Sequence, residues 1–236
     1  MKRVKIESRP IRSKVVRNGN TVWYRENSSD LLMYEENAYK NIQFLDTDVV
    51  MDIGANMGDV PLRYAKSVKF IHSYEPMADT FEILNLNVTH NEFNNCQTYQ
   101  CAVTRNVGEV TMWLNEKAKT AHSTASVIKR NGERSAITVP SISFEDEVKR
   151  IKPTIIKMDI EGAEIDILDS VDDSIFDGVR AFLLEVHLNA IKHEDPEEWN
   201  HKLGQRFSKI FDVSRSVPVY FGKTKTAYVW EFFNNV

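Results

Sequence analysis

Short apolar segments alternate with segments of helical periodicity along most of this chain. The alternation is typical of an α/β fold, in which a mostly parallel sheet carries helices on both faces. The polar and apolar alternation of the last segment suits an edge or antiparallel strand. Helices are expected at 58–65, 77–90 and 161–170, and strands at 49–53, 70–74, 96–103, 154–158, 181–187, 207–214 and 226–232.

Two further regions extend this pattern. KVVRNGNTVWY at 14–24 predicts a hairpin around an Asn-Gly turn, and the apolar spacing of 31–44 predicts a helix that follows capping residues. We expect this hairpin and helix, within 1–47, to form an accessory cover on an α/β core at 48–236. Because internal repeats, low-complexity tracts and Pro/Gly-rich linkers are absent from the sequence, a single domain over 1–236 is predicted. A polar excursion from Val107 to Val139 predicts a hairpin or loop beside the ligand pocket.

Composition excludes several classes of protein. The formal net charge of −4 over 236 residues gives no general attraction for nucleic acid. The first seventeen residues are basic, which is typical of a solvated edge strand or flexible arm and leaves a phosphate-binding arm as the alternative. No apolar run approaches the ~20 residues of a membrane helix, and the N-terminus lacks the apolar core of a signal peptide, so a cytoplasmic protein is expected. Cys96 and Cys101, the only cysteines, exclude a disulfide scaffold and a cysteine-rich zinc site.

The segment VVMDIGANMGD at 49–59 places a loop with two glycines directly after an expected strand. In an open parallel sheet, such a loop lies at the ligand crevice. A P-loop needs Gly-Lys-Ser/Thr, which this segment lacks, and a dinucleotide loop needs three glycines, of which one is missing here. S-Adenosylmethionine fits the loop better, because it carries a sulfonium and an ammonium group instead of a phosphate and therefore suits neighbouring carboxylates.

Asp52, Gly54 and Glu75 carry the clearest ligand chemistry in this region. Asp52 can bind the ammonium group directly or through water, and Gly54 lets the main chain approach the methionine moiety. Glu75 follows the next expected strand and can accept both ribose hydroxyls. NAD enzymes use an acid at that place too, and an aspartate that caps a turn beside ordinary turn glycines is the structural alternative. The three residues together favour S-adenosylmethionine.

Five segments occur in the order VVMDIGANMGD, HSYEPMADTFEILNLNVTHN, QCAVT, IIKMDIEGAE and FLLEVH. In this order and spacing they resemble the FkbM family of S-adenosylmethionine-dependent methyltransferases. The resemblance runs from about Val49 to His187, and KMDIEGAE at 157–164 is its most specific segment. It implies a Rossmann-like class I methyltransferase fold with a seven-stranded sheet, and transfer of methyl groups to hydroxyls of sugars and natural products.

The resemblance also implies a set of cofactor-binding residues. The implied set is Asp52, Gly54, Asn56 and Gly58 for the methionine end, Glu75 for the ribose, and Pro76, Met77, Ala102 and Val103 for the adenine. Of these, Met77 and Val103 have a structural alternative, because both could equally be plain core residues.

Candidate acceptor residues follow two later strands. Asp159 comes directly after 154–158, while Glu185 and His187 lie two residues apart and therefore share one side of a strand. An alcohol needs a base or a metal that acidifies it. His187 has the intrinsic pKa of a general base, and Glu185 could orient that imidazole, bind a sugar hydroxyl or remove the proton itself. Asp159 could bind the acceptor.

A divalent metal is left open at this stage. Magnesium would take oxygen ligands from Asp159, Glu185 and a substrate diol, but the sequence has no tight aspartate cluster that demands it. Structural alternatives are a helix cap for Asp159 and an ordinary strand-end histidine for His187. Lys157 is expected to pair with an acid.

These predictions describe an O-methyltransferase that transfers a methyl group from S-adenosylmethionine to a hydroxyl of a sugar or glycan by in-line displacement. The loop chemistry predicts the cofactor, and the resemblance alone implies the hydroxyl. RNA and a polyketide-type hydroxyl are alternative acceptors, although the acidic net charge disfavours nucleic acid. A non-catalytic binding module with the same fold, and one domain of a larger glycan-modifying protein, are further alternatives.

Overall fold

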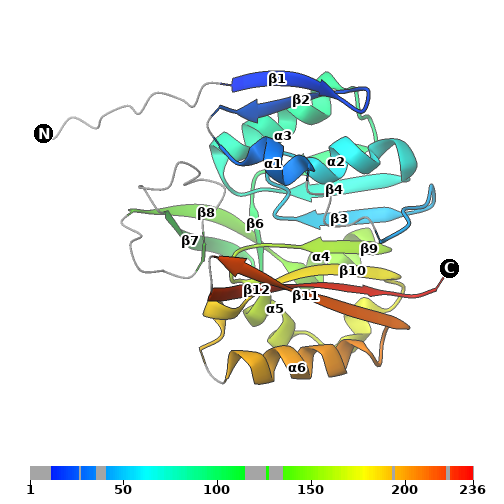
Figure 1. Ribbon diagram of the computed structural model, residues 1–236, viewed down its shortest axis with the longest axis vertical. Helices are drawn as coiled ribbons and strands as arrows, with labels where there is room; N and C mark the ends of the chain where they lie inside the picture. Colours follow the sequence, from blue (N-terminus) through cyan, green and yellow to red (C-terminus); the bar gives the residue numbers. More distant parts are fainter. Residues whose placement is uncertain are drawn as a thin grey trace, which may run out of the picture.

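The computed structural model describes residues 12–26, 28–35, 41–114, 126–127, 135–192, 195–221 and 224–235. Its centre is a seven-stranded sheet (Figure 1). The strands are β1 (Arg12–Arg17), β2 (Asn20–Arg25), β3 (Val49–Ile53), β4 (Phe70–Tyr74), β5 (Cys96–Tyr99), β6 (Ala102–Thr104), β7 (Gly108–Leu114), β8 (Ser135–Ser143), β9 (Ile155–Met158), β10 (Ala181–His187), β11 (Val213–Phe221) and β12 (Thr224–Phe233). The helices are α1 (Asp30–Glu35), α2 (Asp59–Tyr64), α3 (Ala78–His90), α4 (Phe144–Ile151), α5 (Glu164–Ser170) and α6 (Pro196–Phe207).

The main sheet has the strand order β11-β12-β10-β9-β3-β4-β5. Strands β10, β9, β3, β4 and β5 are parallel, β12 runs antiparallel to β10, and β11 runs antiparallel to β12. The prediction of a mostly parallel sheet with an antiparallel last strand is therefore confirmed. The chain builds outward from β3 to β5 and then returns to β9 on the other side of β3, so the strand order reverses there. Open α/β sheets bind ligands beyond the carboxyl ends of their strands at such a point.

Helices cover both faces of this sheet because successive strand side chains enter different apolar clusters. Met51 and Ile53 of β3 pack with residues of α4, α5 and α6, whereas Val50 packs with residues of α2 and α3. Figure 1 shows α2 and α3 on one side of the strands and α6 on the other. Burial on both faces fixes the position of β3, since a slip of one residue would exchange its faces.

The predicted N-terminal hairpin is confirmed. β1 and β2 pair antiparallel around a turn at 18–19 and lie over α3 (Figure 1). Val22 of β2 is fully buried in the same apolar cluster as α2 and α3. The hairpin therefore shares the core of one face of the sheet.

The helix predicted at 31–44 is only partly right. α1 ends at Glu35, and the next described residues, 41–44, are not helical. Phe44 instead stacks on Tyr64, with ring centroids 3.7 Å apart. This aromatic contact with α2 outweighs the helical periodicity of the segment.

The strand predicted at 96–103 is two strands in different sheets. β5 lies at the edge of the main sheet, whereas β6 pairs with β8 in a three-stranded sheet of order β6-β8-β7. Ala102 and Met112 of this small sheet share an apolar cluster with Met77, so the chain leaves the main sheet to cover a second core. The predicted excursion contributes β7 and β8, which pair antiparallel.

The strand predicted at 207–214 is wrong. The chain forms α6 up to residue 207, and β11 begins only at Val213. Asp195 caps α6 by accepting hydrogen bonds from two backbone N–H groups of its first turn, and Pro196 occupies the first turn. The buried residues of α6 follow a helical spacing that the strand assignment overlooked: Trp199, Leu203 and Phe207. Among the described residues, no helix is long and apolar enough to cross a membrane.

Candidate active site

A pocket of about 670 Å³ opens beyond the carboxyl ends of β3, β4 and β9. The small sheet contributes Ala102, Val103 and Met112 to its lining. Among the residues expected to bind the cofactor, those that line this pocket are Gly54, Asn56, Glu75, Pro76, Met77, Ala102 and Val103.

Gly54 allows the ends of β3 and β9 to approach closely. It has a φ of 77°, and a Cβ at this position would lie 1.8 Å from the carbonyl oxygen of Asp159. The amide groups of Gly54 and Ala55 both donate to the carbonyl of Tyr74, at 3.0 and 2.9 Å. The loop is thus fixed between β4 and β9, and only a glycine fits at its start.

Gly58 lies behind the pocket rather than in its wall. It has a φ of 94°, and a Cβ there would lie 2.8 Å from the Leu84 side chain of α3. The residue also forms the N-cap of α2. Gly58 therefore shapes the loop through packing against α3, without a contact to the pocket.

Glu75 holds both sides of the loop at the end of β4. One carboxylate oxygen accepts from the amide of Asn56 at 3.0 Å, and the other accepts from the amide of Met77 at 2.9 Å. Burial raises the pKa of Glu75 to about 7, against the lowering effect of these two hydrogen bonds. Each oxygen keeps a second lone pair, so the carboxylate can accept two further hydrogen bonds from a ligand diol.

Asp52 lies beneath the glycine loop in a buried network. Its side chain is fully buried, accepts from the Ser73 hydroxyl at 3.0 Å and lies 3.6 Å from the Lys157 ammonium. Burial raises the pKa of Asp52 to about 7, although the charge of Lys157 opposes this shift. Asp52 does not line the pocket, so its side chain acts on the loop from below.

Lys157 joins this network to the loop and to the pocket wall. Its ammonium donates to the carbonyl of Gly54 at 2.5 Å and lies 4.0 Å from the Asp159 carboxylate. Burial alone would lower the pKa of Lys157, but the surrounding carboxylates raise it above its ordinary value. The expected pairing of this lysine with an acid is confirmed, with Asp52 as the nearest carboxylate.

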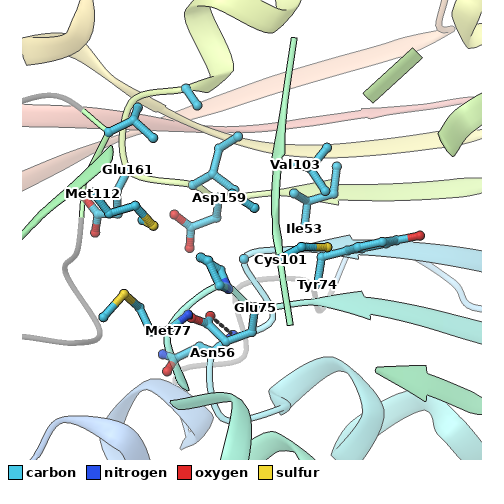
Figure 2. Close-up of a pocket in the computed structure, with 16 residues that line it drawn as sticks. Ile53, Asn56, Tyr74, Glu75, Met77, Cys101, Val103, Met112, Asp159 and Glu161 are labelled. Atoms are coloured by element: carbon cyan, nitrogen blue, oxygen red, sulfur yellow. Dashed lines mark hydrogen bonds between the residues drawn. The ribbon is translucent and has the colours of Figure 1, made fainter. Parts of the chain in front are cut away.

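The predicted acceptor residues come together at the ends of β9 and β10. Asp159, Glu185 and His187 each offer one ligand-type atom, and these atoms lie within 4.8 Å of one another. Glu161 joins them from the loop after β9, with its carboxylate 3.2 Å from the imidazole Nε2. Figure 2 shows the Asp159 and Glu161 carboxylates across the pocket from Glu75. Asp159 and Glu161 therefore line the ligand space on the side opposite the ribose candidate, whereas Glu185 and His187 adjoin them without lining the pocket.

Glu161 reaches this place through an unusual backbone. Its φ is 57°, in the left-handed region that non-glycine residues rarely adopt, and Gly162 follows with a φ of 116°. The carbonyl of Glu161 accepts from the Ser126 hydroxyl at 2.5 Å. Ser126 also forms a bridge with Trp113 of β7, so the small sheet holds the loop that carries Glu161.

His187 is held as an imidazolium between carboxylates. Nδ1 lies 2.6 Å from Glu164, which also accepts the backbone amide of His187 at 2.9 Å. Burial alone would lower the pKa of His187, but the Glu164 charge and hydrogen bond raise it to about 10. The Glu164 side chain is fully buried, and the imidazolium holds its pKa below the ordinary value. A charged imidazole at neutral pH does not suit a general base.

Glu185 differs from His187, because its surroundings shift its pKa toward the uncharged form. Its carboxylate lies 3.7 Å from Nε2 of His187. Burial, followed by the nearby Asp159 charge, raises the pKa of Glu185 to about 8. The ionised fraction of Glu185 therefore grows as the pH rises from neutrality, and this ionised form can accept a proton during a reaction.

Several residues in the pocket wall, and Glu164 behind it, were not predicted from the sequence. Met112 and Val127 line the pocket and belong to the excursion between Val107 and Val139. The sequence did not predict which of its residues reach the pocket, because that depends on how the small sheet forms. Glu161 and Glu164 stand in the KMDIEGAE segment but looked like acids of a first helical turn. A hint was available for Glu161, because the following glycine permits a sharp bend at that point. The excursion also carries two polar residues that could reach an acceptor, His122 and Ser123, and both lie outside the described residues.

The seven-stranded sheet with an antiparallel end and a pocket beyond β3 and β4 defines the class I methyltransferase fold. The structure of TYW2 from M. jannaschii in complex with AdoMet is similar, with a TM-score of 0.53 and 12% identity over 98% of this chain and 90% of that chain. At this identity the similarity shows the fold alone.

The family follows from the sequence comparison. A family model described as the methyltransferase FkbM domain matches residues 52–209. The chain therefore belongs to the FkbM family of S-adenosylmethionine-dependent methyltransferases, as its motifs predicted. "Methyltransferase 1" from Beauveria bassiana (strain ARSEF 2860) is 24% identical over 177 residues, which cover 65% of this chain and 70% of that protein.

A crystal structure of methyltransferase FkbM from Methylobacillus flagellatus KT is also similar in fold. The TM-score is 0.53 with 14% identity, over 84% of this chain. The match covers 48% of that protein, so this chain spans about half of its length.

Proposed function

We propose that this protein transfers the methyl group of S-adenosylmethionine to a hydroxyl of a sugar or glycan. One observation carries the proposal: the Asp159 and Glu161 carboxylates line the pocket opposite the Glu75 carboxylate, and Glu185 adjoins them through the shared cluster with His187. Carboxylates accept hydrogen bonds from hydroxyl groups, and a polyol offers several such donors in a small space. A patch of this kind suits a hydroxylated acceptor better than an apolar one.

The opposite half of the pocket fits S-adenosylmethionine. When bound, this cofactor supplies a methyl group on a positively charged sulfur. Glu75 would accept the ribose hydroxyls with the lone pairs that its two backbone hydrogen bonds leave. Gly54 leaves open main chain for the methionine end, and Met77 with Val103 would contact the adenine. Asp52 would act indirectly, because Lys157 connects it to the Gly54 carbonyl.

Glu185 is the proposed general base. It would take the proton from the acceptor hydroxyl as the oxygen bonds to the methyl carbon and the carbon–sulfur bond breaks. His187 is engaged by Glu164 and Glu161 through its two ring nitrogens, so its role is to balance the negative charge of the cluster. Asp159 would orient the acceptor. Alignment of the three reacting atoms supplies much of the rate in such a displacement.

A metal-assisted form of the same reaction has one observation in its favour. The ligand-type atoms of Asp159, Glu185 and His187 lie within 4.8 Å of one another. Magnesium prefers oxygen ligands and would acidify a bound hydroxyl. Dialysis against EDTA separates the two forms: activity lost and then restored by magnesium supports the metal, whereas unchanged activity leaves Glu185 as the base.

The described basic residues of the N-terminal segment give no support to an RNA acceptor. Arg12 pairs with Glu82 of α3, and Arg17 lies 3.5 Å from Glu35. Lys14 lies over the Trp23 ring, with its ammonium 5.1 Å from the ring centroid. These charges therefore have partners within the protein.

The test combines cofactor binding with product analysis. Calorimetry should detect binding of S-adenosylmethionine but not of NAD; tight NAD binding without a response to S-adenosylmethionine would refute the cofactor assignment. Labelled S-adenosylmethionine is then incubated with sugars, glycosides, RNA and polyketide alcohols, and the product is mapped by mass spectrometry. A methylated sugar is expected, and methylation of RNA alone would refute the acceptor class.

Variants then separate the roles of the cluster. Glu185→Gln should lower kcat by about 100-fold while cofactor affinity stays within about twofold, because a general base typically contributes that much. Glu198→Gln, an exposed carboxylate on α6 paired with Lys202, is the matched control and should retain full turnover. Full activity of Glu185→Gln would show that the base lies elsewhere.

A further inference from the structure

The N-terminal hairpin reaches the cofactor loop through one buried arginine, Arg25 at the end of β2. Its guanidinium binds Asp30 through two nitrogens, at 3.0 and 2.7 Å, and donates to the Thr80 hydroxyl of α3 at 2.9 Å. The nitrogen Nη2 also donates to the side-chain oxygen of Asn56, at 3.3 Å. Arg25 is 5% exposed and Asp30 is fully buried, so this network is shielded from water and its interactions are strong.

Asn56 is the point at which this network meets the candidate cofactor site. Its φ is 48°, in the left-handed region that costs a non-glycine residue about 1 kcal/mol. In this conformation its amide donates to Glu75 at 3.0 Å, and the residue lines the pocket. A contact that holds the Asn56 side chain therefore also favours the backbone that fixes the Glu75 carboxylate.

A second buried side chain links the same elements. The Asn87 side chain of α3 accepts from the Trp23 amide of β2 at 2.6 Å and donates to the Trp23 carbonyl at 3.0 Å. It also donates to the carbonyl of Met57, directly after Asn56, at 2.7 Å. Two adjacent loop residues are thus connected to β2 from separate directions.

We propose that Arg25 is a positioning residue of the cofactor site, which makes the N-terminal hairpin a functional part of the enzyme. The inference rests on the proposed function only in taking the pocket at Glu75 as the place where S-adenosylmethionine binds. Arg25 itself does not line the pocket. It acts through Asn56, whose backbone orients Glu75 toward the ribose.

The geometry requires an arginine at this position. The planar guanidinium presents several donors in a fixed fork, and Asp30 with Thr80 fixes its orientation. One donor is then aimed at Asn56. A lysine would keep a positive charge beside Asp30, but its single ammonium cannot reach all three partners in the same way.

Substitution of Arg25 by lysine tests this assignment without leaving Asp30 as an unpaired buried charge. Arg25→Lys should raise the Kd and the KM for S-adenosylmethionine by about tenfold, since hydrogen bonds to charged groups contribute that order of binding free energy. At saturating cofactor, kcat should stay within about twofold of the unaltered protein. Loss of fold alone would not separate KM from kcat in this way.

Arg12→Lys is the matched control, because Arg12 connects the same hairpin to the same helix α3 through Glu82 and contacts no loop residue in the described structure. It should leave cofactor affinity within about twofold, even if both variants melt at similar temperatures. Equal loss of affinity in Arg12→Lys and Arg25→Lys would overturn the proposal, as would unchanged affinity in Arg25→Lys.

A double-mutant cycle isolates the contact with Asn56. Asn56→Gly keeps the left-handed backbone without strain and removes the oxygen that Arg25 binds. If the coupling exists, Arg25→Lys should have little further effect on cofactor affinity in the Asn56→Gly background; additive losses would overturn the proposal. Failure of the unaltered protein to bind S-adenosylmethionine would instead refute the proposed function.

Discussion

Glu164→Gln tests the charge state of the candidate site through its stability. Glu164 is fully buried and accepts from the Gly162 amide, from the His187 amide and from His187 Nδ1. Glutamine has the same shape but no charge. Its amide group must also turn an N–H toward one of these three donors. The substitution thus removes the anion that keeps His187 protonated.

The magnitude follows from the pKa of His187. A folded-state value of about 10 lies about three units above pH 7, and each unit corresponds to about 1.4 kcal/mol, so about 4 kcal/mol is the upper limit. The variant regains part of this free energy, because its imidazole can lose the proton and become neutral. We expect a loss of about 3 kcal/mol at pH 7, typical of a broken buried ion pair, and a fall in Tm of about 6 to 12 °C.

The pH dependence has a defined sign. The pKa of His187 is raised from its ordinary 6.5, so its contribution to stability is complete below pH 6.5 and is lost as the pH rises through about 10. Glu164 has a lowered pKa, so its contribution is present above pH 4.5 and is lost as the pH falls through the folded value. The difference between the two proteins should therefore be largest between about pH 4.5 and pH 6.5 and shrink steadily as the pH rises toward 10.

Urea unfolding of both proteins from pH 6 to pH 10 measures this difference, and nitrogen-15 NMR reports the protonation of His187 directly. The imidazole should remain charged at pH 8 in the unaltered protein and titrate near its ordinary pKa in the variant. Glu198→Gln, which removes an exposed carboxylate, should leave stability unchanged. The reasoning fails if Glu164→Gln costs less than about 1 kcal/mol, or if its cost is the same at pH 7 and pH 10.

Three further substitutions test the loop and its support. Gly54→Ala places a Cβ 1.8 Å from the Asp159 carbonyl oxygen and should lower the free energy of unfolding in urea by about 3 kcal/mol. Gly178→Ala is the control, because Gly178 also has a positive φ but has open space around it, and it should cost about 1 kcal/mol. Equal costs would contradict the close approach of β3 and β9. Glu75→Gln turns an amide N–H toward a backbone donor and should weaken S-adenosylmethionine binding by at least about tenfold in calorimetry, and unchanged affinity would argue against its ribose role. Lys157→Met removes the cation among buried carboxylates, so that carboxylates such as Asp52 are more stable when protonated. The Tm of this variant should therefore rise as the pH falls from 8 to 6, and a Tm independent of pH would contradict the network.

The sequence predicted the fold wherever local periodicity and tertiary packing agree. Strands β3, β9 and β10 are buried on both faces over most of their length, so their apolar runs appear directly in the sequence. The errors lie where a long-range contact decides the outcome. Phe44 leaves the helical pattern to stack on Tyr64, and the chain after Tyr99 changes sheets because Ala102 and Val103 cover the pocket instead of extending β5.

The sequence also predicted the candidate site only where local pattern was sufficient. Gly54 and Glu75 follow strands with a known direction, so the sequence predicted that they would lie near each other at the ligand crevice. The partners of His187 could not be predicted from the sequence, because Glu164 lies 23 residues away along the chain and looked like an ordinary acid at a helix start. An intrinsic pKa describes an isolated imidazole. Burial beside a carboxylate reverses the expected charge, and only the structure supplies that neighbour.

The same neighbours explain why so many acids can share one end of a sheet. Two buried cations, Lys157 and His187, lie beneath and beside the pocket, each within 4.0 Å of more than one carboxylate. They balance part of the negative charge and leave an excess that faces the ligand space. An anionic dinucleotide would add to this excess, whereas a sulfonium and an ammonium group would reduce it. The electrostatic balance thus favours a cationic cofactor for the same reason that the glycine loop lacks the features of a phosphate site. The carboxylates that line the pocket are Glu75, Asp159 and Glu161.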